Sequence, residues 1–312
     1  MKILQIITFL FLPLISTGQV TLMKGEVKDS QDSSKIAYAT VSLLNANRAV
    51  STETTGLFQL LVPKYSQIDT LLVSALGYKT ILIPVSIFEK NPTIILEKKA
   101  HQSTFKKYTK SKQKEILNKF NASETNFYVG LSKYRHNFNY LQIAQKLKLK
   151  HKQAQLSSVN IERLVYSEYP NLFTPKVRFR IRIYDIDPTT LGPGAELTYK
   201  SIVINESGDK DMIKVNLSDY DIQIPSDCFF VAVEWLRIAY NECESHAFSS
   251  KDYSVTTSVR YKSVIDYLPP IGMSSKKGDE INTWALNFRN QWEIYTYFAP
   301  DLTDFAISAE VQ

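Results

Sequence analysis

The sequence predicts an all-β protein. Its 312 residues are 44% hydrophobic, enough for folded cores, and its 18 Tyr and 16 Phe outnumber its 10 Gly, a composition typical of strands. In Lys176–Asp185 apolar residues alternate with three arginines, which predicts a strand with one face on a core and the other outward. Cys228–Ile238 is apolar on both faces apart from Glu234 and Arg237, as expected of a central strand that is covered on both sides.

Residues 1–18 have the features of a secretory signal. Lys2 precedes an apolar run over residues 3–15, and small residues at 16–18 offer a cleavage site. The run is shorter than the roughly 20 apolar residues that a membrane helix needs, and no later stretch is long enough to span a bilayer. We therefore expect an exported protein, periplasmic or associated with the outer membrane rather than secreted, with no transmembrane segment in the mature chain.

Residues 19–97 predict a small β-sandwich. Short apolar runs follow one another there, separated by turn-forming clusters and with no helical period between them. The runs are Leu22–Val27, Ala39–Leu44, Leu57–Val62, Asp69–Ser74, Thr80–Pro84 and Thr93–Leu96. Gly56 and Gly77 stand where tight turns must lead into or out of a strand.

An ordered series of motifs in the same segment resembles a known family. The motifs are Gly25-x-Val27, Ile36-x-x-Ala39-x-Val41-x-Leu43, Ser51-Thr52-x-x-x-Gly56-x-Phe58-x-Leu60 and Asp69-x-Leu71-x-Val73-Ser74-x-x-Gly77-Tyr78. In these residues the segment resembles the carboxypeptidase regulatory-like domain, although Lys35 stands where Pro is usual and no Asp lies just before Gly56. The resemblance implies a transthyretin-like sandwich in an exported protein of the Bacteroidota type, where the domain is an accessory and implies no catalysis.

Residues 98–121 predict a basic linker with a short helix. Over residues 98–152, thirteen Lys and one Arg stand against two Glu, a net charge of +12 in a chain whose total is +6. We expect helical pieces over Thr104–Phe120 and Asn139–Lys146. A solvated linker is the favoured interpretation, and attachment to an anionic lipid surface is the alternative. No nucleic-acid partner is expected, because the chain has no recognisable nucleic-acid module.

Residues 122–312 predict a second, larger β-sandwich of jelly-roll-like type. Strand-like segments there are joined by turns rich in Pro, Gly, Asn and Asp. They are Phe127–Leu131, Ser157–Ser167, Lys176–Asp185, Thr198–Ile204, Met212–Asn216, Cys228–Ile238, Ser254–Tyr261, Trp284–Tyr297 and Phe305–Val311. We expect Cys228 and Cys243 to be free thiols. A straight strand from Cys228 to Ile238 is about 30 Å long, and the five residues that follow reach back at most about 18 Å.

The sequence lacks the residue patterns of the common catalytic sites. None of its four His lies in a zinc-peptidase ligand pattern, and it has no Gly-x-Ser-x-Gly elbow and no glycine-rich phosphate loop. Glu234 is a carboxylate within an apolar strand, but no second carboxylate lies near it in the sequence to form an acid–base pair. The sequence therefore predicts no catalytic residue and no cofactor.

Two groupings of charged residues are candidate binding sites. Asp185 and Asp187 offer the hard oxygen ligands that calcium prefers, although turn-capping aspartates explain this spacing more simply. A basic row on one strand face could bind an anionic partner, although such rows more often pair with acids on the neighbouring strand. The row consists of Arg178, Arg180 and Arg182.

Aromatic residues near the C-terminus are the third candidate. They could form a flat platform for a sugar ring, although a sandwich core also needs large aromatic side chains. They are Trp284, Trp292, Tyr295 and Tyr297. The function that the sequence supports best is a non-enzymatic exported protein of the cell envelope, a binding or assembly module with a protein partner. The alternatives are a carbohydrate-binding module and a hydrolase, or hydrolase accessory, that acts on glycans or peptides.

Overall fold

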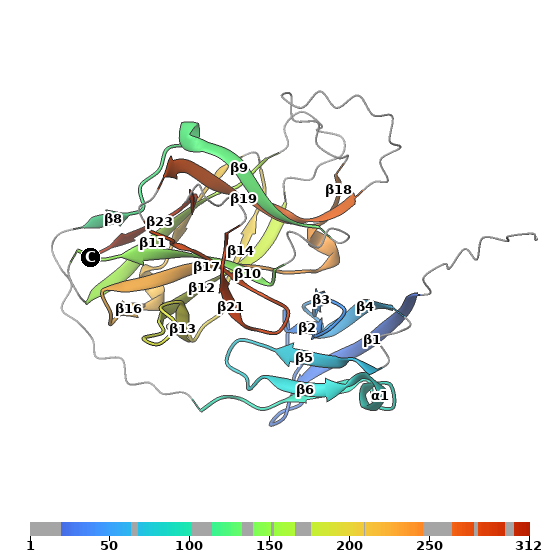
Figure 1. Ribbon diagram of the computed structural model, residues 1–312. Coiled ribbons are helices and arrows are strands. Elements are labelled where there is room, and N and C mark those ends of the chain that lie inside the picture. The colour runs from blue at the N-terminus through green and yellow to red at the C-terminus, as the bar shows by residue number, and fades with distance from the viewer. Residues whose placement is uncertain are drawn as a thin grey trace, which may run out of the picture.

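The computed structural model describes residues 20–63, 68–100, 114–132, 140–150, 153–165, 176–208, 210–245, 264–277, 280–296 and 303–312. Their regular structure is almost entirely strand, which confirms the all-β prediction (Figure 1). In this part of the chain no helix is long and apolar enough to cross a membrane. The predicted signal, residues 101–113 of the linker, Tyr297 and the predicted strand Ser254–Tyr261 lie outside the described residues.

The N-terminal domain is a sandwich of two sheets. Its elements are β1 (Val20–Asp29), β2 (Thr40–Leu43), β3 (Arg48–Ser51), β4 (Leu57–Pro63), β5 (Thr70–Ser74), β6 (Ile81–Pro84), α1 (Val85–Phe88) and β7 (Thr93–Leu96). One sheet has the order β4-β1-β7 and the other β3-β2-β5-β6, and an apolar core lies between them. Gly25 of β1 allows Phe58 and Phe88 to lie over the strand, because a Cβ atom there would be 2.8 Å and 2.6 Å from the two rings.

The C-terminal domain contains three sheets. Its strands are β8 (Glu115–Leu117), β9 (Thr125–Ser132), β10 (Gln142–Lys148), β11 (Ala154–Glu162), β12 (Val177–Ile186), β13 (Pro193–Glu196), β14 (Ile202–Glu206), β15 (Met212–Asn216), β16 (Gln223–Ile224), β17 (Cys228–Trp235), β18 (Glu242–Ser245), β19 (Val264–Lys277), β20 (Thr283–Leu286), β21 (Trp292–Ile294), β22 (Thr303–Phe305) and β23 (Ile307–Val311). Short 3-10 turns lie at Ala122–Glu124, Ser218–Tyr220 and Ala239–Asn241. The large sheet has the order β13-β12-β17-β10-β20-β21, with β14 beside β12. A second sheet has the order β15-β11-β23-β8 with β16 beside β11, and a third has β18-β19-β22 with β9 beside β19.

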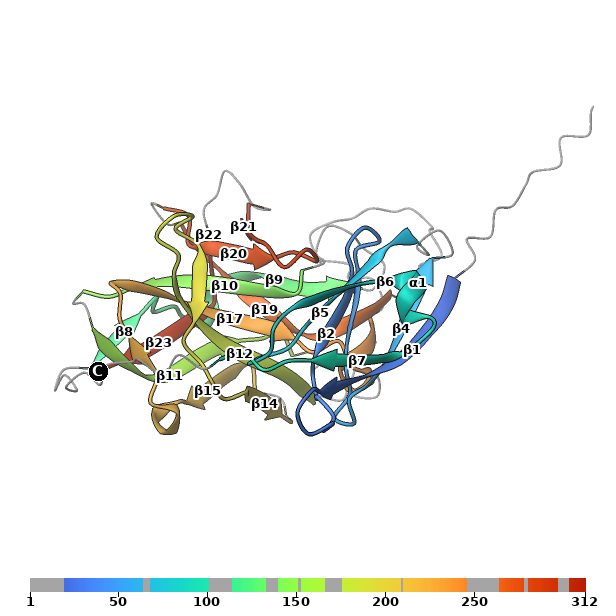
Figure 2. The ribbon, with the colours of Figure 1, turned by 90° about the horizontal axis from the view of Figure 1, so that it is seen from below.

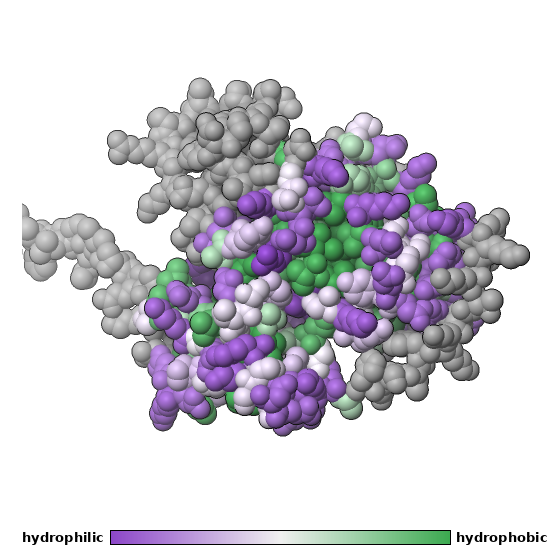
Figure 3. Space-filling model, turned by 180° about the vertical axis from the view of Figure 1, so that it is seen from behind, coloured by the Kyte–Doolittle hydropathy of each residue, from purple (hydrophilic) through white to green (hydrophobic). Residues whose placement is uncertain are grey.

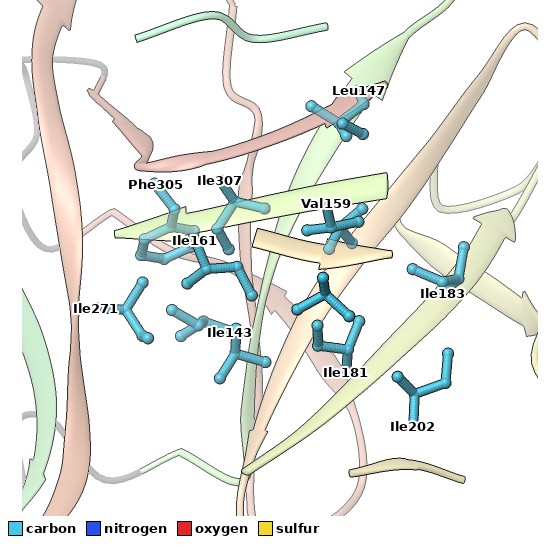
Figure 4. Packing of buried hydrophobic residues seen from close by; sticks show 14 of the residues in the cluster. Ile143, Leu147, Val159, Ile161, Ile181, Ile183, Ile202, Ile271, Phe305 and Ile307 are labelled. Carbon is cyan, nitrogen blue, oxygen red and sulfur yellow. The ribbon is translucent and has the colours of Figure 1, made fainter. Parts of the chain in front are cut away.

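All three sheets contribute to one apolar core. Phe179, Ile181 and Ile183 of β12 point into it, so the arginines that alternate with them point to the outer face of the large sheet. Figure 4 shows apolar side chains of β10, β11, β12, β19 and β23 packed against one another. All eight residues of β17 are buried, as expected of a strand covered on both faces.

Two segments that the sequence predicts as helical contain strands instead. In the described part of Thr104–Phe120, β8 pairs with β23 at the edge of the second sheet, so the C-terminal sheets begin before the predicted boundary at residue 122. In place of a helix over Asn139–Lys146, β10 lies in the large sheet between β17 and β20. The spacing of Ile143 and Leu147 suits one face of a helix and one face of a strand alike, and pairing on both sides decides for the strand.

The predicted single strand Trp284–Tyr297 is a hairpin of β20 and β21. Its turn is held by Asn287, whose side-chain oxygen accepts hydrogen bonds from the amides of Arg289 and Gln291, each 3.0 Å long. The turn carries Phe288 towards the N-terminal domain, where the Phe288 carbonyl accepts a 3.2 Å hydrogen bond from Ser42 Oγ. Figure 2 shows the N-terminal domain, blue to cyan, at one end of the C-terminal domain.

Candidate functional site

The basic row of β12 lies where the two domains meet. β12 pairs with β17 in a register that places Arg180 opposite Glu234. Nη1 of Arg180 lies 3.2 Å from Oε2 of Glu234, and both residues are almost fully buried, at 3% and 4% exposure. A lone carboxylate in an apolar strand thus has its cation on the neighbouring strand, as charge neutralisation in a buried site requires.

Arg182 extends this ion pair into a network. Its guanidinium binds Glu196 of β13 in a bidentate manner, with distances of 2.7 Å and 2.5 Å, and its Nη1 lies 3.6 Å from Oε2 of Glu234. Tyr184, the next residue on this face, donates a 2.9 Å hydrogen bond to Gln142 of β10. Burial raises the pKa of Tyr184 well above its ordinary range, so its hydroxyl stays a neutral donor.

The N-terminal domain covers this network. Thr40 of β2 donates a 3.4 Å hydrogen bond to Oε1 of Glu234. The carbonyl of Tyr38 accepts a 3.4 Å bond from Arg180, and the hydroxyl of Tyr38 accepts a 3.1 Å bond from Arg178. All three contacts join residues of the N-terminal domain to the outer face of the large sheet. Arginines of the basic row therefore bind residues of the same chain.

Backbone groups strengthen the same junction. The amide N–H of Ser51, the last residue of β3, donates a 3.1 Å hydrogen bond to the carbonyl of Arg237. The Oγ of Ser51 accepts a 3.0 Å hydrogen bond from the amide N–H of Arg237. The amide of Ala239 donates to the Glu53 carboxylate at 3.1 Å. The Arg237 guanidinium packs on the Phe288 ring, 5.2 Å from its centroid. Burial lowers the pKa of Arg237 to about 10.

The chemistry of the junction is that of a polar clamp. Glu196 and Glu234 both contact Arg182, so two carboxylates do converge, but on a shared cation. Glu234 lies beneath Thr40 and is bound to Arg180. A general acid or base must reach the proton that it transfers, and a carboxylate enclosed in this way has lost that reach.

The aromatic candidates do not form an exposed platform in the part of the chain that the structure describes. Trp284 is buried under the β12–β13 loop, where a Cβ atom on Gly192 would lie 2.6 Å from Cζ3 of the indole. Trp292 is half-buried, and its ring meets Tyr184 edge-on at 5.4 Å between centroids. Tyr295 is buried against Phe305.

Of the two candidate calcium ligands, Asp187 caps a turn and Asp185 lies within β12. Asp187 accepts the amides of Thr189 and Thr190 at 2.7 Å and 3.1 Å, and these bonds lower its pKa. Asp185 accepts the amide of Ile186 at 2.9 Å. Among the described residues there is no group of three or more His, Cys, Asp or Glu arranged to hold a metal. The geometry of Asp187 is that of a turn-capping aspartate.

Cys228 is a buried free thiol at the start of β17, and burial raises its pKa. The side chain of Cys243 lies outside the described residues.

Several residues that form the junction are absent from the sequence-based candidates. Tyr38, Thr40, Ser42 and Ser51 come from the N-terminal domain and are ordinary polar residues of short strands and turns. The one signal that pointed towards them was Glu234, since a carboxylate in an apolar strand requires buried polar partners. Nothing in the local sequence shows that one of these partners, Thr40, comes from the other domain.

Comparison with known proteins agrees with the N-terminal motifs. Residues 23–107 match the model of the CarboxypepD_reg-like domain family, a match that extends past the predicted boundary at residue 97. No curated protein matches the chain.

Two solved structures show distant likeness to the chain. One contains the cysteine protease and lectin-like domains of Cwp84, a surface layer associated protein of Clostridium difficile, with 12% identity over 56% of this chain and 32% of that chain, and a TM-score of 0.32. The other is the clostridial cysteine protease Cwp84 after propeptide cleavage, with 12% identity over 93% of this chain and 70% of that chain, and a TM-score of 0.37. The chain thus spans about a third of the length of the first structure. At these TM-scores neither likeness bears on fold or function.

Proposed function

We propose, from the premise that residues 23–107 are a CarboxypepD_reg-like domain, that the chain is a non-enzymatic exported protein of the cell envelope. It acts as a binding or assembly module, in the periplasm or at the periplasmic face of the outer membrane, and its partner is another envelope protein.

The observation that carries this proposal is that the charged side chains of the junction are bound to other residues of the same chain. Three candidate groups are engaged in the junction: Arg180 and Arg182 are both bound to Glu234, while Tyr38 binds Arg180 and Thr40 binds Glu234. They hold two domains together, which is a structural task. A protein that combines two domains in this way offers its remaining outer surfaces to partners.

One such surface is the outer face of the sheet β4-β1-β7. The other sheet of the N-terminal domain turns Thr40 and Ser42 into the junction, where both are buried. On β4-β1-β7, by contrast, Leu22, Leu57 and Leu61 are 41–50% exposed, and the β1–β4 register places Leu22 opposite Leu61. In Figure 3, apolar residues also gather on the C-terminal domain, surrounded by polar ones. Exposed apolar patches with polar rims are typical of interaction sites.

The test is cross-linking of the protein in intact cells, followed by membrane fractionation and mass spectrometry of what travels with it. The proposal predicts recovery of one outer-membrane receptor or assembly complex. Leu61→Glu, which places a charge on the exposed face of β4, is expected to reduce that recovery.

The matched control is Leu191→Glu, which changes a similarly exposed leucine on the β12–β13 loop and is expected to behave like the unmodified protein. Recovery of the protein alone in the soluble fraction would contradict the proposal and direct attention to glycan binding. Equal recovery with both variants would show that the β4-β1-β7 face is not the surface used.

A further inference from the structure

Arg178 is the one arginine of the basic row that has no carboxylate partner among the described residues. Arg180 is paired with Glu234, and Arg182 is paired with both Glu196 and Glu234. The contacts of the Arg178 guanidinium are with neutral groups instead. Within the part of the chain that the structure describes, no ion pair therefore balances its positive charge.

The guanidinium of Arg178 is nevertheless held in position, and both domains contribute to this. Its Nη1 donates a 3.1 Å hydrogen bond to the hydroxyl of Tyr38, which belongs to the N-terminal domain. Its Nε and Nη2 each lie 3.4 Å from Oδ1 of Asn205 in β14, the strand that lies beside the N-terminal domain in Figure 2. Its Cζ lies 4.6 Å from the centroid of the Tyr240 ring, within the range of a cation–π contact.

The backbone on which these groups stand is fixed as well. The side chain of Asn241, which is fully buried, accepts the amide of Arg178 at 2.8 Å and donates to the carbonyl of the same residue. Tyr38 has a φ of 58°, a left-handed conformation that is costly for a bulky residue and is often found at functional sites. The site is therefore ordered before any ligand arrives, which lowers the entropy lost on binding.

The site has hydrogen-bond donors left over. A guanidinium has five N–H donors, and three hydrogen bonds from Arg178 leave two of them unused. The Tyr38 hydroxyl accepts its bond from Arg178, so its own hydrogen is still available, and no described residue accepts it. Arg178 and Tyr38 are only half-buried, and Tyr240 is 38% exposed, so a ligand can reach them from solvent.

This set of donors fits a carboxylate. One fixed positive charge with two N–H donors matches the single charge and the two oxygens of a carboxylate, which guanidinium groups commonly bind. A phosphate brings more negative charge than Arg178 alone balances.

We propose that Arg178, together with Tyr38 and Tyr240, binds a carboxylate group of a partner protein, on an Asp or Glu side chain or at a free C-terminus. The choice of a protein as the ligand rests on the proposed function, and it agrees with the enrichment of Arg and Tyr at the centres of protein interfaces. The two unused N–H groups of Arg178 bind the carboxylate oxygens, and the hydroxyl of Tyr38 is a third donor.

Titration of the isotope-labelled full chain with acetate, followed by NMR at neutral pH, tests this inference. The Nε–H signal of Arg178 is expected to shift and to saturate with a Kd on the order of millimolar, the scale of a weak single contact. Acetamide has nearly the same shape and no charge, and it is expected to leave the signal unchanged.

Three further probes identify the source of the carboxylate. Acetyl-Gly-Glu-Gly-amide carries it on a side chain, acetyl-Gly-Gly-Gly carries it at a free C-terminus, and glucuronate carries it on a sugar. One of the two peptides is expected to bind more tightly than glucuronate. Tighter binding of glucuronate than of either peptide would overturn the assignment to a protein partner.

Substitutions show whether the binding depends on this arginine, with the backbone amide signals of Tyr38 and Tyr240 as the readout. Arg178→Gln is expected to weaken acetate binding at least about tenfold, because the charge-assisted hydrogen bonds are lost. Tyr38→Phe keeps the ring and removes one donor, so a smaller loss is expected. The matched control is Arg289→Gln, which changes an exposed arginine on the β20–β21 turn and is expected to bind acetate like the unmodified protein.

Two results with acetate would overturn the inference. One is a titration of the unmodified protein, which needs no variant, in which the signal does not saturate or acetamide shifts it equally. The other is equal weakening by Arg178→Gln and Arg289→Gln. If acetate does not bind and cells still yield the envelope partner, the inference fails and the proposed function stands.

Discussion

Glu234 is the residue whose replacement best tests the junction. Glu234→Gln keeps the size of the side chain and removes its charge, leaving Arg180 buried without its carboxylate. Removing one partner of a buried ion pair costs about 3–5 kcal/mol. Two features place this case near the lower end of that range. The amide oxygen can still accept a hydrogen bond from Arg180, and Arg182 keeps its bidentate contact with Glu196.

A loss of about 3 kcal/mol corresponds to a fall in the unfolding midpoint of about 6–12 °C, at 2–4 °C per kcal/mol for domains of about 150–250 residues. Urea unfolding followed by tryptophan fluorescence and thermal unfolding followed by circular dichroism both measure the change. Trp235, Trp284 and Trp292 all belong to the C-terminal domain, so the fluorescence reports on the domain that holds the buried pair.

The matched control is Glu97→Gln in the exposed pair with Lys79. That pair has a shorter distance, 2.9 Å, but its side chains are 68% and 61% exposed, and exposed pairs contribute about 1 kcal/mol or less. Glu234→Gln is therefore expected to lower the free energy of unfolding far more than Glu97→Gln, although the exposed pair has the shorter distance. If Glu234→Gln costs no more than Glu97→Gln, the assignment of the buried pair as a structural clamp is refuted.

Two further changes have definite expected outcomes. Asp29 accepts a hydrogen bond from Lys98, which with its other donors lowers its pKa to about 2. Its stabilising effect is therefore complete above about pH 4 and is lost as the pH falls through 2. Denaturant unfolding between pH 2 and pH 5 should show this slope, and Asp29→Asn should flatten it; an unchanged slope would contradict the assignment. Gly192→Ala forces a methyl group against the Trp284 ring. It should cost about 1–3 kcal/mol, as overpacking does, and shift the tryptophan emission; a variant as stable as the parent with the same emission would contradict the close packing.

The sequence predicts most where the signal is local. Lys176–Asp185 alternates strictly, and the structure places Phe179, Ile181 and Ile183 in the core as expected. The sequence does not predict β19, because Pro269 and Pro270 have no amide hydrogen and prolines are unfavourable within a strand. The structure accommodates them at a register shift between Tyr267 and Ile271, a feature that depends on β9 and that the local sequence does not contain.

For the candidate site, too, the sequence predicts the local features and does not predict the contacts between distant segments. Strand alternation predicts that the basic row leaves the core, and it does. The residues that bind the row and Glu234 come from elsewhere in the chain. Tyr38 is hydrogen-bonded to Arg178, 140 residues away in the sequence, and Thr40 is hydrogen-bonded to Glu234, 194 residues away. No local pattern carries such a pairing. The burial of Trp284 is likewise not contained in its local sequence, because the loop around Gly192 that covers it is distant in sequence.

A buried polar junction joins the two domains into one unit, and calorimetry of the intact chain shows whether they unfold together. The unmodified protein is expected to show a single unfolding transition. In Glu234→Gln that single transition should fall in temperature, because the buried pair with Arg180 loses its charge. Two separate transitions in the unmodified protein, at temperatures that the substitution does not change, would contradict the claim.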